Sequence, residues 1–436
     1  MTSADGDVSC SEGTSKSGTV TERLAVLALR PSPQRDAAAI ISPGSGGATT
    51  SFWYLNQLAR VLATALIRPP FNVVPDSVCA VYLPASAEYI IANVAIFTAR
   101  GAMVYFEVNY TRKLIADLIK ASGTRCVLTV ARLSATLPDD MAHLLLDEGW
   151  DTRLWALIAR ATLQEQAVAR LFDSYVDPQS LAYCSMSSGT TGAPKAILVE
   201  HHSCMHNILA RESVCPYDVD LTADIEACNV FFVWEALRAP VHGRSTLVVP
   251  NEIVVDGRRL TSFLLEHKAT RFMVTPSLLR NLLDQPGLNF ARFVGTQLRH
   301  VLLEGEVVPT ALVNDFATAF DHFRTTLVNY YSTWESLDVA CTTLFDPSRR
   351  DETKTWLRTL PPGGNLAPVG MPLPGVCLLI RDEISGRTTP RGVPGAVYII
   401  AKSIACVPPS VTQLSIEFKS NESGHETMHI RWCFSL

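Results

Sequence analysis

Several features are absent from this 436-residue chain, and each absence excludes a class of protein. The most apolar stretch, residues 78–106, is interrupted by Pro84, Glu88 and Arg100, so it does not predict a membrane span. The polar first 20 residues lack the apolar region of a secretory signal. With a formal net charge of −5 and no basic run, the chain does not resemble a nucleic-acid binder.

The 11 cysteines form no Cys-x-x-Cys pair, and their number is odd. This pattern favours reduced, buried thiols over a disulfide framework, and we expect a cytoplasmic protein. Hydrophobic residues make up 47% of the chain and charged residues 18%, which is typical of a globular protein. The length predicts two or three domains or subdomains, preceded by a disordered tail over residues 1–20.

Apolar strands alternate with amphipathic helices along much of the chain. Between residues 78 and 130 the pattern predicts strand, helix, strand, helix and strand, with Gly123 ending the second helix. The same rhythm returns over residues 244–306, so we expect a second sheet with flanking helices. Residues 133–175 are rich in Leu and Ala and predict helix, whereas residues 366–400 predict strands joined by turns.

Residues 185–195 read SMSSGTTGAPK, and this stretch carries the clearest sign of a ligand. Gly189 and Gly192 let the backbone turn and approach a bound group closely. A flexible surface linker is the alternative, and the spacing is not that of a Walker A loop. Hydrogen-bond donors and a positive charge that can cradle phosphate oxygens come from Ser187, Ser188, Thr190, Thr191 and Lys195.

The loop closely resembles the phosphate-binding signature of the adenylate-forming (AMP-binding) superfamily, which includes acyl-CoA synthetases, luciferases and the adenylation domains of nonribosomal peptide synthetases. Other segments resemble further family motifs in the family's order, and together they cover about residues 20 to 400. The order and length favour the peptide-synthetase branch. These segments are residues 51–63, residues 78–110 with Glu107 near an acidic position of the family, LRHVLLEGEVV at 298–308, NYYSTWES at 329–336 and residues 367–399.

The resemblance implies an α/β fold made of the large N-terminal subdomains of these enzymes. Two parallel-type sheets with flanking helices and a β-rich distorted barrel are expected. The adenylation core would span residues 21–400, and residues 401–436 resemble no part of the family. The family activates a carboxylic acid with ATP, which gives an acyl-adenylate and pyrophosphate.

The resemblance also implies which residues take part in catalysis and bind ATP and Mg²⁺. The loop 187–195, including the catalytic Lys195, would hold the β- and γ-phosphates. Glu335 would bind Mg²⁺ as a hard oxygen ligand, although a solvated carboxylate at a helix start is the alternative. Tyr331 would stack on adenine, and Gly305 would line the adenine slot. Ser332 and Trp334 replace the usual glycine and threonine of this motif.

The expected acid pocket departs from the family at one position. Residues 229–240 resemble the Phe-Asp-x-Ser-x-Trp-Glu segment, whose aspartate pairs with the substrate α-amino group, but Val230 stands in its place. A valine cannot pair with a buried ammonium, so the substrate is expected not to be an ordinary α-amino acid, or its amine is held elsewhere. By the resemblance, the pocket comprises Val230, Phe231, Trp234, Val274, Leu302, Glu304, Tyr330, Asp338 and Val339.

Two members of this set, Glu304 and Asp338, are acidic among mainly apolar neighbours. They could hold an amine farther from the carboxylate, as in a β-amino acid or a diamine. Alternatively, one or both face water.

The family's ribose-binding Thr-Gly-Asp motif and its lid, which carries a catalytic lysine, do not follow the strand at 395–399. Three explanations stay open: a fragment of a longer synthetase, an inactive copy that binds nucleotide or a partner protein without turnover, or a subunit completed by a separate lid. The expected partners are therefore a small carboxylic or amino acid and either a carrier-protein domain or such a lid.

Overall fold

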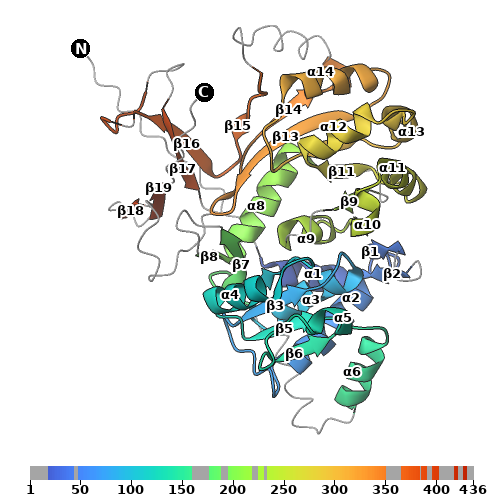
Figure 1. Cartoon of the computed structure of the whole chain (residues 1–436), viewed down its shortest axis with the longest axis vertical. Helices are drawn as coiled ribbons and strands as arrows, with labels where there is room; N and C mark the ends of the chain where they lie inside the picture. The colour runs from blue at the N-terminus through green and yellow to red at the C-terminus, as the bar shows by residue number, and fades with distance from the viewer. Residues whose placement is uncertain are drawn as a thin grey trace.

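The computed structural model of the chain (Figure 1) contains two large β-sheets with helices on their faces. It describes residues 18–43, 48–159, 176–187, 195–218, 224–229, 233–349, 365–382, 384–389, 395–401, 417–420 and 426–429. Residues 1–17 of the expected tail and most of residues 402–436 therefore lie outside the described part.

The smaller of the two sheets has six strands in the order β6-β5-β3-β4-β7-β8. Every neighbouring pair is parallel except the β7–β8 hairpin, so the predicted parallel sheet is confirmed. The strands are β3 (Val78–Tyr82), β4 (Ala102–Tyr105), β5 (Cys126–Thr129), β6 (His143–Leu145), β7 (Leu181–Ser187) and β8 (Lys195–Glu200).

Two predicted helices, α3 (Ala87–Thr98) and α4 (Arg112–Ser122), connect strands of this sheet. Thr111 caps the start of α4, and Gly123 ends it with a φ of +66°, a conformation that favours glycine. Gly123 is thus confirmed as the end of this helix.

The prediction of helix throughout residues 133–175 is wrong in part. Short helix α5 (Ala131–Ser134) and α6 (Trp150–Ala159) flank the edge strand β6, which pairs with β5. Backbone pairing at an open sheet edge outweighs the weak helical preference of this short stretch. Residues 160–175 lie outside the described part.

The larger sheet has nine strands in the order β15-β14-β13-β12-β11-β9-β10-β1-β2. Its centre is parallel, and its two edges are antiparallel. The strands are β1 (Ala38–Ser42), β2 (Ala48–Ser51), β9 (Ile225–Cys228), β10 (Ser245–Val248), β11 (Arg271–Val274), β12 (His300–Leu303), β13 (Thr326–Thr333), β14 (Leu337–Phe345) and β15 (Met371–Pro372).

Helices lie between the two sheets and over the outer face of each (Figure 1). The inner layer holds α1 (Val20–Ala28), α2 (Phe52–Leu66), α3, α8 (His201–Val214) and α9 (Val233–Val241). The outer face of the larger sheet carries α11 (Gly257–Glu266), α12 (Pro276–Asp284), α13 (Phe290–Val294) and α14 (Thr310–Ala319), and α10 (Asn251–Val254) precedes α11. Helices α4 and α5 cover the outer face of the smaller sheet.

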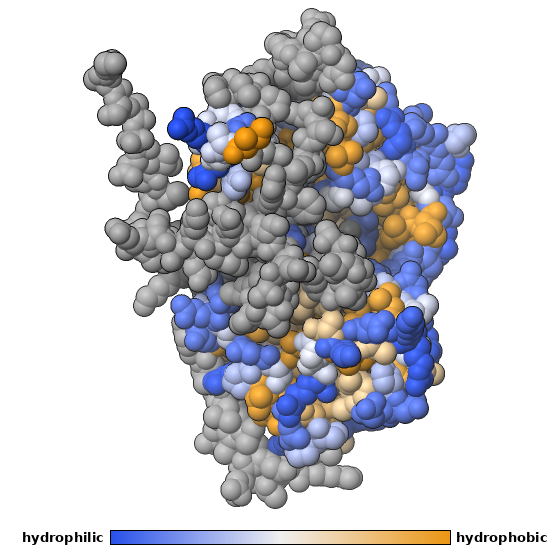
Figure 2. Space-filling model, turned by 60° about the vertical axis from the view of Figure 1, so that its left-hand side comes forward, coloured by the Kyte–Doolittle hydropathy of each residue, from blue (hydrophilic) through white to orange (hydrophobic). Residues whose placement is uncertain are grey.

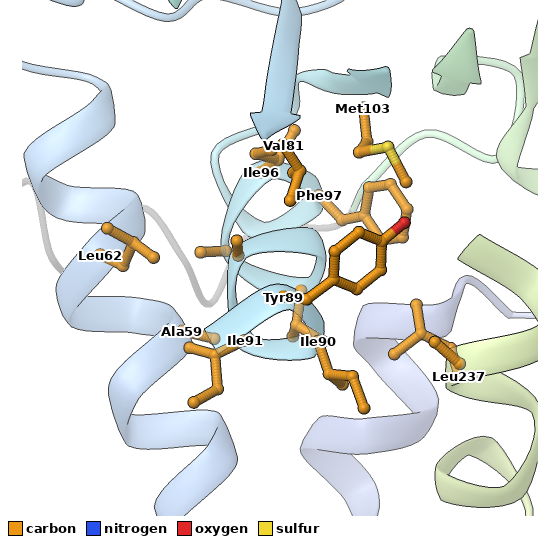
Figure 3. Packing of buried hydrophobic residues seen from close by; sticks show 14 of the residues in the cluster. Ala59, Leu62, Val81, Tyr89, Ile90, Ile91, Ile96, Phe97, Met103 and Leu237 are labelled. Carbon is orange, nitrogen blue, oxygen red and sulfur yellow. The ribbon is translucent and has the colours of Figure 1, made fainter. Parts of the chain in front are cut away.

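The inner helices share one apolar core. Helix α2 carries leucines at positions 55, 58, 62 and 66, three or four residues apart. All four are buried, as this helical periodicity predicts. Figure 3 shows Ala59 and Leu62 of α2 turned toward Ile91 of α3, and Leu237 of α9 beside Ile90. This packing joins the two halves of the molecule, which are the smaller sheet and the larger sheet with their outer helices.

The expected β-rich barrel is not closed by the described residues. Strands β16 (Val376–Arg381) and β17 (Ala396–Ala401) form a two-stranded antiparallel ribbon, and β18 (Glu417–Ser420) and β19 (Glu426–His429) form a second. A barrel needs a closed ring of paired strands, and here each strand pairs with one partner only.

The eight cysteines of the described part are free, and six of them are buried, in line with the expected reduced thiols. None of the helices in the described residues combines the length and the apolarity that crossing a membrane requires. On the face seen in Figure 2, apolar residues gather in a few patches among mainly hydrophilic ones.

Replacing Leu62 by alanine tests the core between the two halves. Leu62 is fully buried, so we expect Leu62→Ala to lower the free energy of unfolding by about 2–5 kcal/mol through lost apolar contact and a residual cavity. The control is Val255→Ala, because Val255 is 86% exposed. Urea unfolding followed by circular dichroism measures both, and equal effects of the two variants would contradict the assignment.

Candidate active site

Five of the residues that the sequence predicts for ligand binding lie at the carboxyl ends of the central strands of the larger sheet. Glu304 and Gly305 directly follow β12, Tyr330 and Tyr331 lie in β13, and Glu335 lies in the turn from β13 to β14. In open α/β sheets, ligands bind outside this edge. The fold thus brings together residues that are about 30 positions apart in the sequence.

One face of this edge carries an apolar cluster of five buried residues. Leu302 and Tyr330, both predicted for the acid pocket, belong to it. Val274 instead packs with Leu303 in the core on the opposite face, and its neighbour Met273 joins Leu302. Side chains alternate along a strand, so a shift of one residue exchanges the faces. The register Met273↔Leu302 puts Met273, a residue that the sequence did not single out, on the same face as Leu302 and Tyr330. The cluster consists of Cys215, Met273, Leu302, Val328 and Tyr330.

Glu335 is buried in the tight turn between two strands and is not a solvated residue at a helix start. The side chains of Thr333 and Ser336 hydrogen-bond across this turn at 2.6 Å, which holds its backbone in place. Tyr331 lies half-buried nearby, and burial, followed by the charge of Glu335, raises its pKa. Glu335 and Tyr331 are therefore neighbours, as the roles proposed for them require.

Gly305 has a φ of +87°, a backbone conformation that residues other than glycine rarely adopt. A Cβ atom built there would meet nothing within 4 Å, so open space lies beside the backbone. This geometry suits a position next to a flat ligand. Val339 is fully buried and packs with Ala340 of its own strand and Ile399 of β17.

The phosphate-loop candidates are only partly described. Ser187 ends β7, Lys195 begins β8, and the two residues are paired in the register of the hairpin, so the loop is closed at its base. The side chains of both lie outside the description, as does that of Trp234 at the start of α9. The candidates Ser188, Gly189, Thr190, Thr191, Gly192, Val230 and Phe231 lie wholly outside the described residues.

A buried ion network, which no sequence pattern indicates, lies beside the pocket residues. Nη1 of Arg211, on α8, lies 2.7 Å from Oε1 of Glu235, 2.9 Å from Oδ2 of Asp338 and 3.1 Å from Oε2 of Glu304. The guanidinium carbon of Arg211 also lies 3.9 Å from the centroid of the Tyr330 ring, a cation–π contact. Glu304 and Asp338 thus contact a cation of the protein itself.

The network continues along α9 into the sheet. Arg238 pairs with Glu235 at 3.1 Å and with Glu226 of β9, which Arg271 of β11 also approaches at 3.3 Å. The Tyr217 hydroxyl donates to Glu226 at 2.5 Å. Apart from Glu304, whose side chain is 12% exposed, the charged side chains of the network are at most 4% exposed.

The carboxylates of this network differ in pKa, because burial and neighbouring charges act on them to different extents. Burial raises the pKa of Glu235 to about 7, although Arg211 and Arg238 act against it. Burial likewise raises the pKa values of Glu304 and Asp338. Burial would also raise the pKa of Glu226, but Arg238 and Arg271 hold it at about 2. The carboxylates around Arg211 are thus the less fully neutralised part of the network.

The family model described as AMP-binding enzyme matches residues 28–405, and the chain belongs to this family. Over 293 residues, 67% of the chain, it is 32% identical to the glycine betaine reductase ATRR of Emericella nidulans. It is 29% identical over 366 residues, 83% of the chain, to a linear gramicidin synthase of Brevibacillus parabrevis. These matches span only 22% and 6% of the two relatives' lengths.

The fold is similar to that of the N-terminal subdomain of NpsA from Klebsiella oxytoca, solved in complex with 3-hydroxyanthranilyl-AMSN. The TM-score is 0.71 at 18% sequence identity, and the similarity covers 95% of each chain. The expected fold of adenylate-forming N-terminal subdomains is therefore confirmed, apart from the closed barrel.

Replacing Glu235 by glutamine tests the electrostatics of the network. A carboxyl group whose pKa is raised on folding, here from 4.5 to about 7, stabilises the fold only while it is protonated. We expect the melting temperature of the native chain, measured relative to that of Glu235→Gln, to fall as the pH rises from about 4.5 to about 7. Thermal melts at a series of pH values measure this difference, and a constant or rising difference would contradict it.

Proposed function

We propose that this chain activates a small carboxylic acid with ATP, giving an acyl-adenylate and pyrophosphate. The observation that carries the proposal is the convergence of Glu304, Gly305, Tyr331 and Glu335 at one sheet edge, in a chain that matches AMP-binding enzymes over most of its length. The similarity to gramicidin synthases supports a role within a protein like a nonribosomal peptide synthetase.

In this reaction a carboxylate oxygen of the acid attacks the α-phosphorus of ATP. The new bond joins that oxygen to phosphorus, and the bond between the α-phosphorus and its bridging oxygen breaks, so that pyrophosphate leaves. Loop 187–195 with Lys195 would hold the β- and γ-phosphates, while Tyr331 and Gly305 would hold adenine. These contacts align the reactants and screen negative charge, which is most of what phosphoryl-group chemistry requires of a protein.

Glu335 is the residue that would bind Mg²⁺. A single buried carboxylate fits this ion, because Mg²⁺ is usually held by one or two carboxylates together with substrate phosphates. When bound, Mg²⁺ would neutralise charge on the phosphates. The turn that holds Glu335 is closed by hydrogen bonds between Thr333 and Ser336, which hold the backbone on either side of this residue.

The acid is not an ordinary α-amino acid. Val230 cannot pair with an α-ammonium, and burying that charge unpaired is costly. One of the relatives is named as a reductase of glycine betaine, an acid whose nitrogen bears three methyl groups and no proton. The activated acid would pass to a carrier-protein thiol or to coenzyme A, in a longer protein or with a separate lid.

Replacing Glu335 by glutamine tests the reaction. We expect Glu335→Gln to lower Mg²⁺-dependent ATP–pyrophosphate exchange at least about tenfold, since loss of even an indirect metal contact has an effect of that size. The control is Glu252→Gln, because Glu252 is an exposed carboxylate of α10. Exchange that is unaffected in Glu335→Gln would refute the role of Glu335. Absence of exchange with every acid tried would instead favour a chain that binds nucleotide without turnover.

Val230, which stands where the family has an aspartate, gives a second test. We expect β-alanine to be activated in preference to alanine, and Val230→Asp to raise exchange with alanine roughly 10–100-fold. A hydrogen bond to a charged group contributes about 1.5–3 kcal/mol, which corresponds to this range. Exchange assays with both amino acids measure it, and preference of the native chain for alanine would contradict the prediction.

A further inference from the structure

A cysteine, a histidine and an arginine meet at the amino ends of the larger sheet's central strands, opposite the predicted ligand site. Arg271, His300 and Thr326 are the first residues of the parallel strands β11, β12 and β13, and they are paired in register. Side chains in register on neighbouring strands share one face of the sheet. Cys215, the residue that ends α8, lies on that face. The proposed activation of an acid uses none of these four side chains.

The guanidinium of Arg271 holds the end of α8. Nη2 donates to the carbonyl oxygen of Cys215 at 2.9 Å and to its Sγ at 3.3 Å, and Nη1 donates to the carbonyl oxygen of Pro216 at 3.0 Å. The Arg271 side chain is 3% exposed, so water screens its positive charge little. A cation this close to a sulfur stabilises the thiolate relative to the thiol.

His300 directs a second N–H toward the same sulfur. Its Nδ1 lies 2.7 Å from Oγ1 of Thr326 and 3.8 Å from Sγ of Cys215. The Thr326 hydroxyl donates its hydrogen to the carbonyl oxygen of Arg299 at 3.2 Å, so Oγ1 accepts from His300. Nδ1 therefore carries a hydrogen, and this hydrogen faces both the oxygen and the sulfur.

These contacts distinguish Cys215 from other buried thiols of the protein. Burial alone would raise the pKa of the Cys215 thiol, but the hydrogen bond from His300 and the charge of Arg271 outweigh burial and lower this pKa. In contrast, burial raises the pKa values of Cys184 and Cys204 to about 12. Cys215 is therefore the thiol with the larger thiolate fraction at neutral pH.

The remaining ionisable groups around Cys215 and Arg271 do not titrate in the same range. The carboxylates lose their protons at lower pH than Cys215, and the tyrosines, Cys341 and the arginine at higher pH. Near neutral pH, the response of this cluster therefore belongs to Cys215 and His300. These groups are Glu212, Tyr217, Glu226, Arg238, Tyr330 and Cys341.

Cys215 also lies close to the surface. It is 6% exposed, whereas Cys79, Cys126 and Cys204 are fully buried. Its chain neighbours Val214 and Pro216 are exposed, and His300 and Thr326 are half-buried. A molecule little larger than water, such as hydrogen peroxide, can approach the sulfur from this side.

We propose that Cys215 is an oxidation site, where a thiolate held by Arg271 and His300 reacts with hydrogen peroxide. The sulfur attacks one peroxide oxygen, so a sulfur–oxygen bond forms and the oxygen–oxygen bond breaks. Sulfur gives up two electrons and becomes a sulfenic acid, and the departing hydroxide takes a proton and becomes water. This reactivity does not depend on the proposed activation of an acid.

The test treats the 436-residue chain with hydrogen peroxide at pH 7, traps sulfenic acid with dimedone and locates the label by peptide mass spectrometry. We expect Cys215 to be labelled at least about tenfold faster than Cys341, because an ordinary thiol is only a few per cent ionised at pH 7. Cys341 and Cys377 are more exposed than Cys215, so the comparison separates charge from access. Labelling of either one before Cys215 would overturn the proposal.

Replacing His300 by glutamine separates an electrostatic role from a structural one. His300→Gln removes the ring N–H and its charge, so oxidation of Cys215 at pH 7 should slow about three- to tenfold, measured as loss of the reduced peptide. The pH profile should move to higher pH, and the rates of the variant and the native chain should converge above about pH 9 as both thiols ionise. The control is His322→Gln, whose native side chain is 89% exposed, and it should leave the profile unchanged. An unmoved profile in His300→Gln, or a rate that stays equally low at every pH, would refute the role of His300.

Discussion

One buried guanidinium connects the parts of this protein that its proposed chemistry requires. Arg211 contacts carboxylates from α9, from the end of β12 and from β14, while its own helix packs between the two sheets. Burying an isolated charge is strongly unfavourable, so each of these groups depends on the others remaining in place. The ion pairs that hold Glu304 and Asp338, two residues predicted for the acid pocket, therefore also fix α8 against the larger sheet.

The mutual dependence of these buried charges matters for the predicted acid pocket, in which Val230 is the unusual residue. Where related enzymes place an aspartate, this chain has Val230, yet carboxylates remain close by at Glu304 and Asp338. Both carboxylates pair with Arg211, which is their counter-charge within the protein.

The sequence predicts most of the fold but only part of the site. Strand β3 and the Gly123 helix end were predicted because apolar runs and a glycine cap are local signals. Strand β6 was missed because three residues at a sheet edge carry no periodicity. The Arg211 network was missed because its ion pairs join residues 24, 93 and 127 positions apart, which no local pattern records. The alternation of side chains along a strand, in contrast, predicts that Met273 and Val274 lie on opposite faces of the sheet.

A buried network in which ion pairs connect three arginines to four carboxylates needs a way to offset the remaining negative charge. Burial raises the pKa of Glu235 to about 7, so a proton on this carboxylate can offset that charge near neutral pH. Loss of the proton as the pH rises restores the unbalanced charge, and the stability that the protonated group contributes is lost between about pH 4.5 and about pH 7. The same buried pairs that fix α8 against the larger sheet therefore make the fold sensitive to pH.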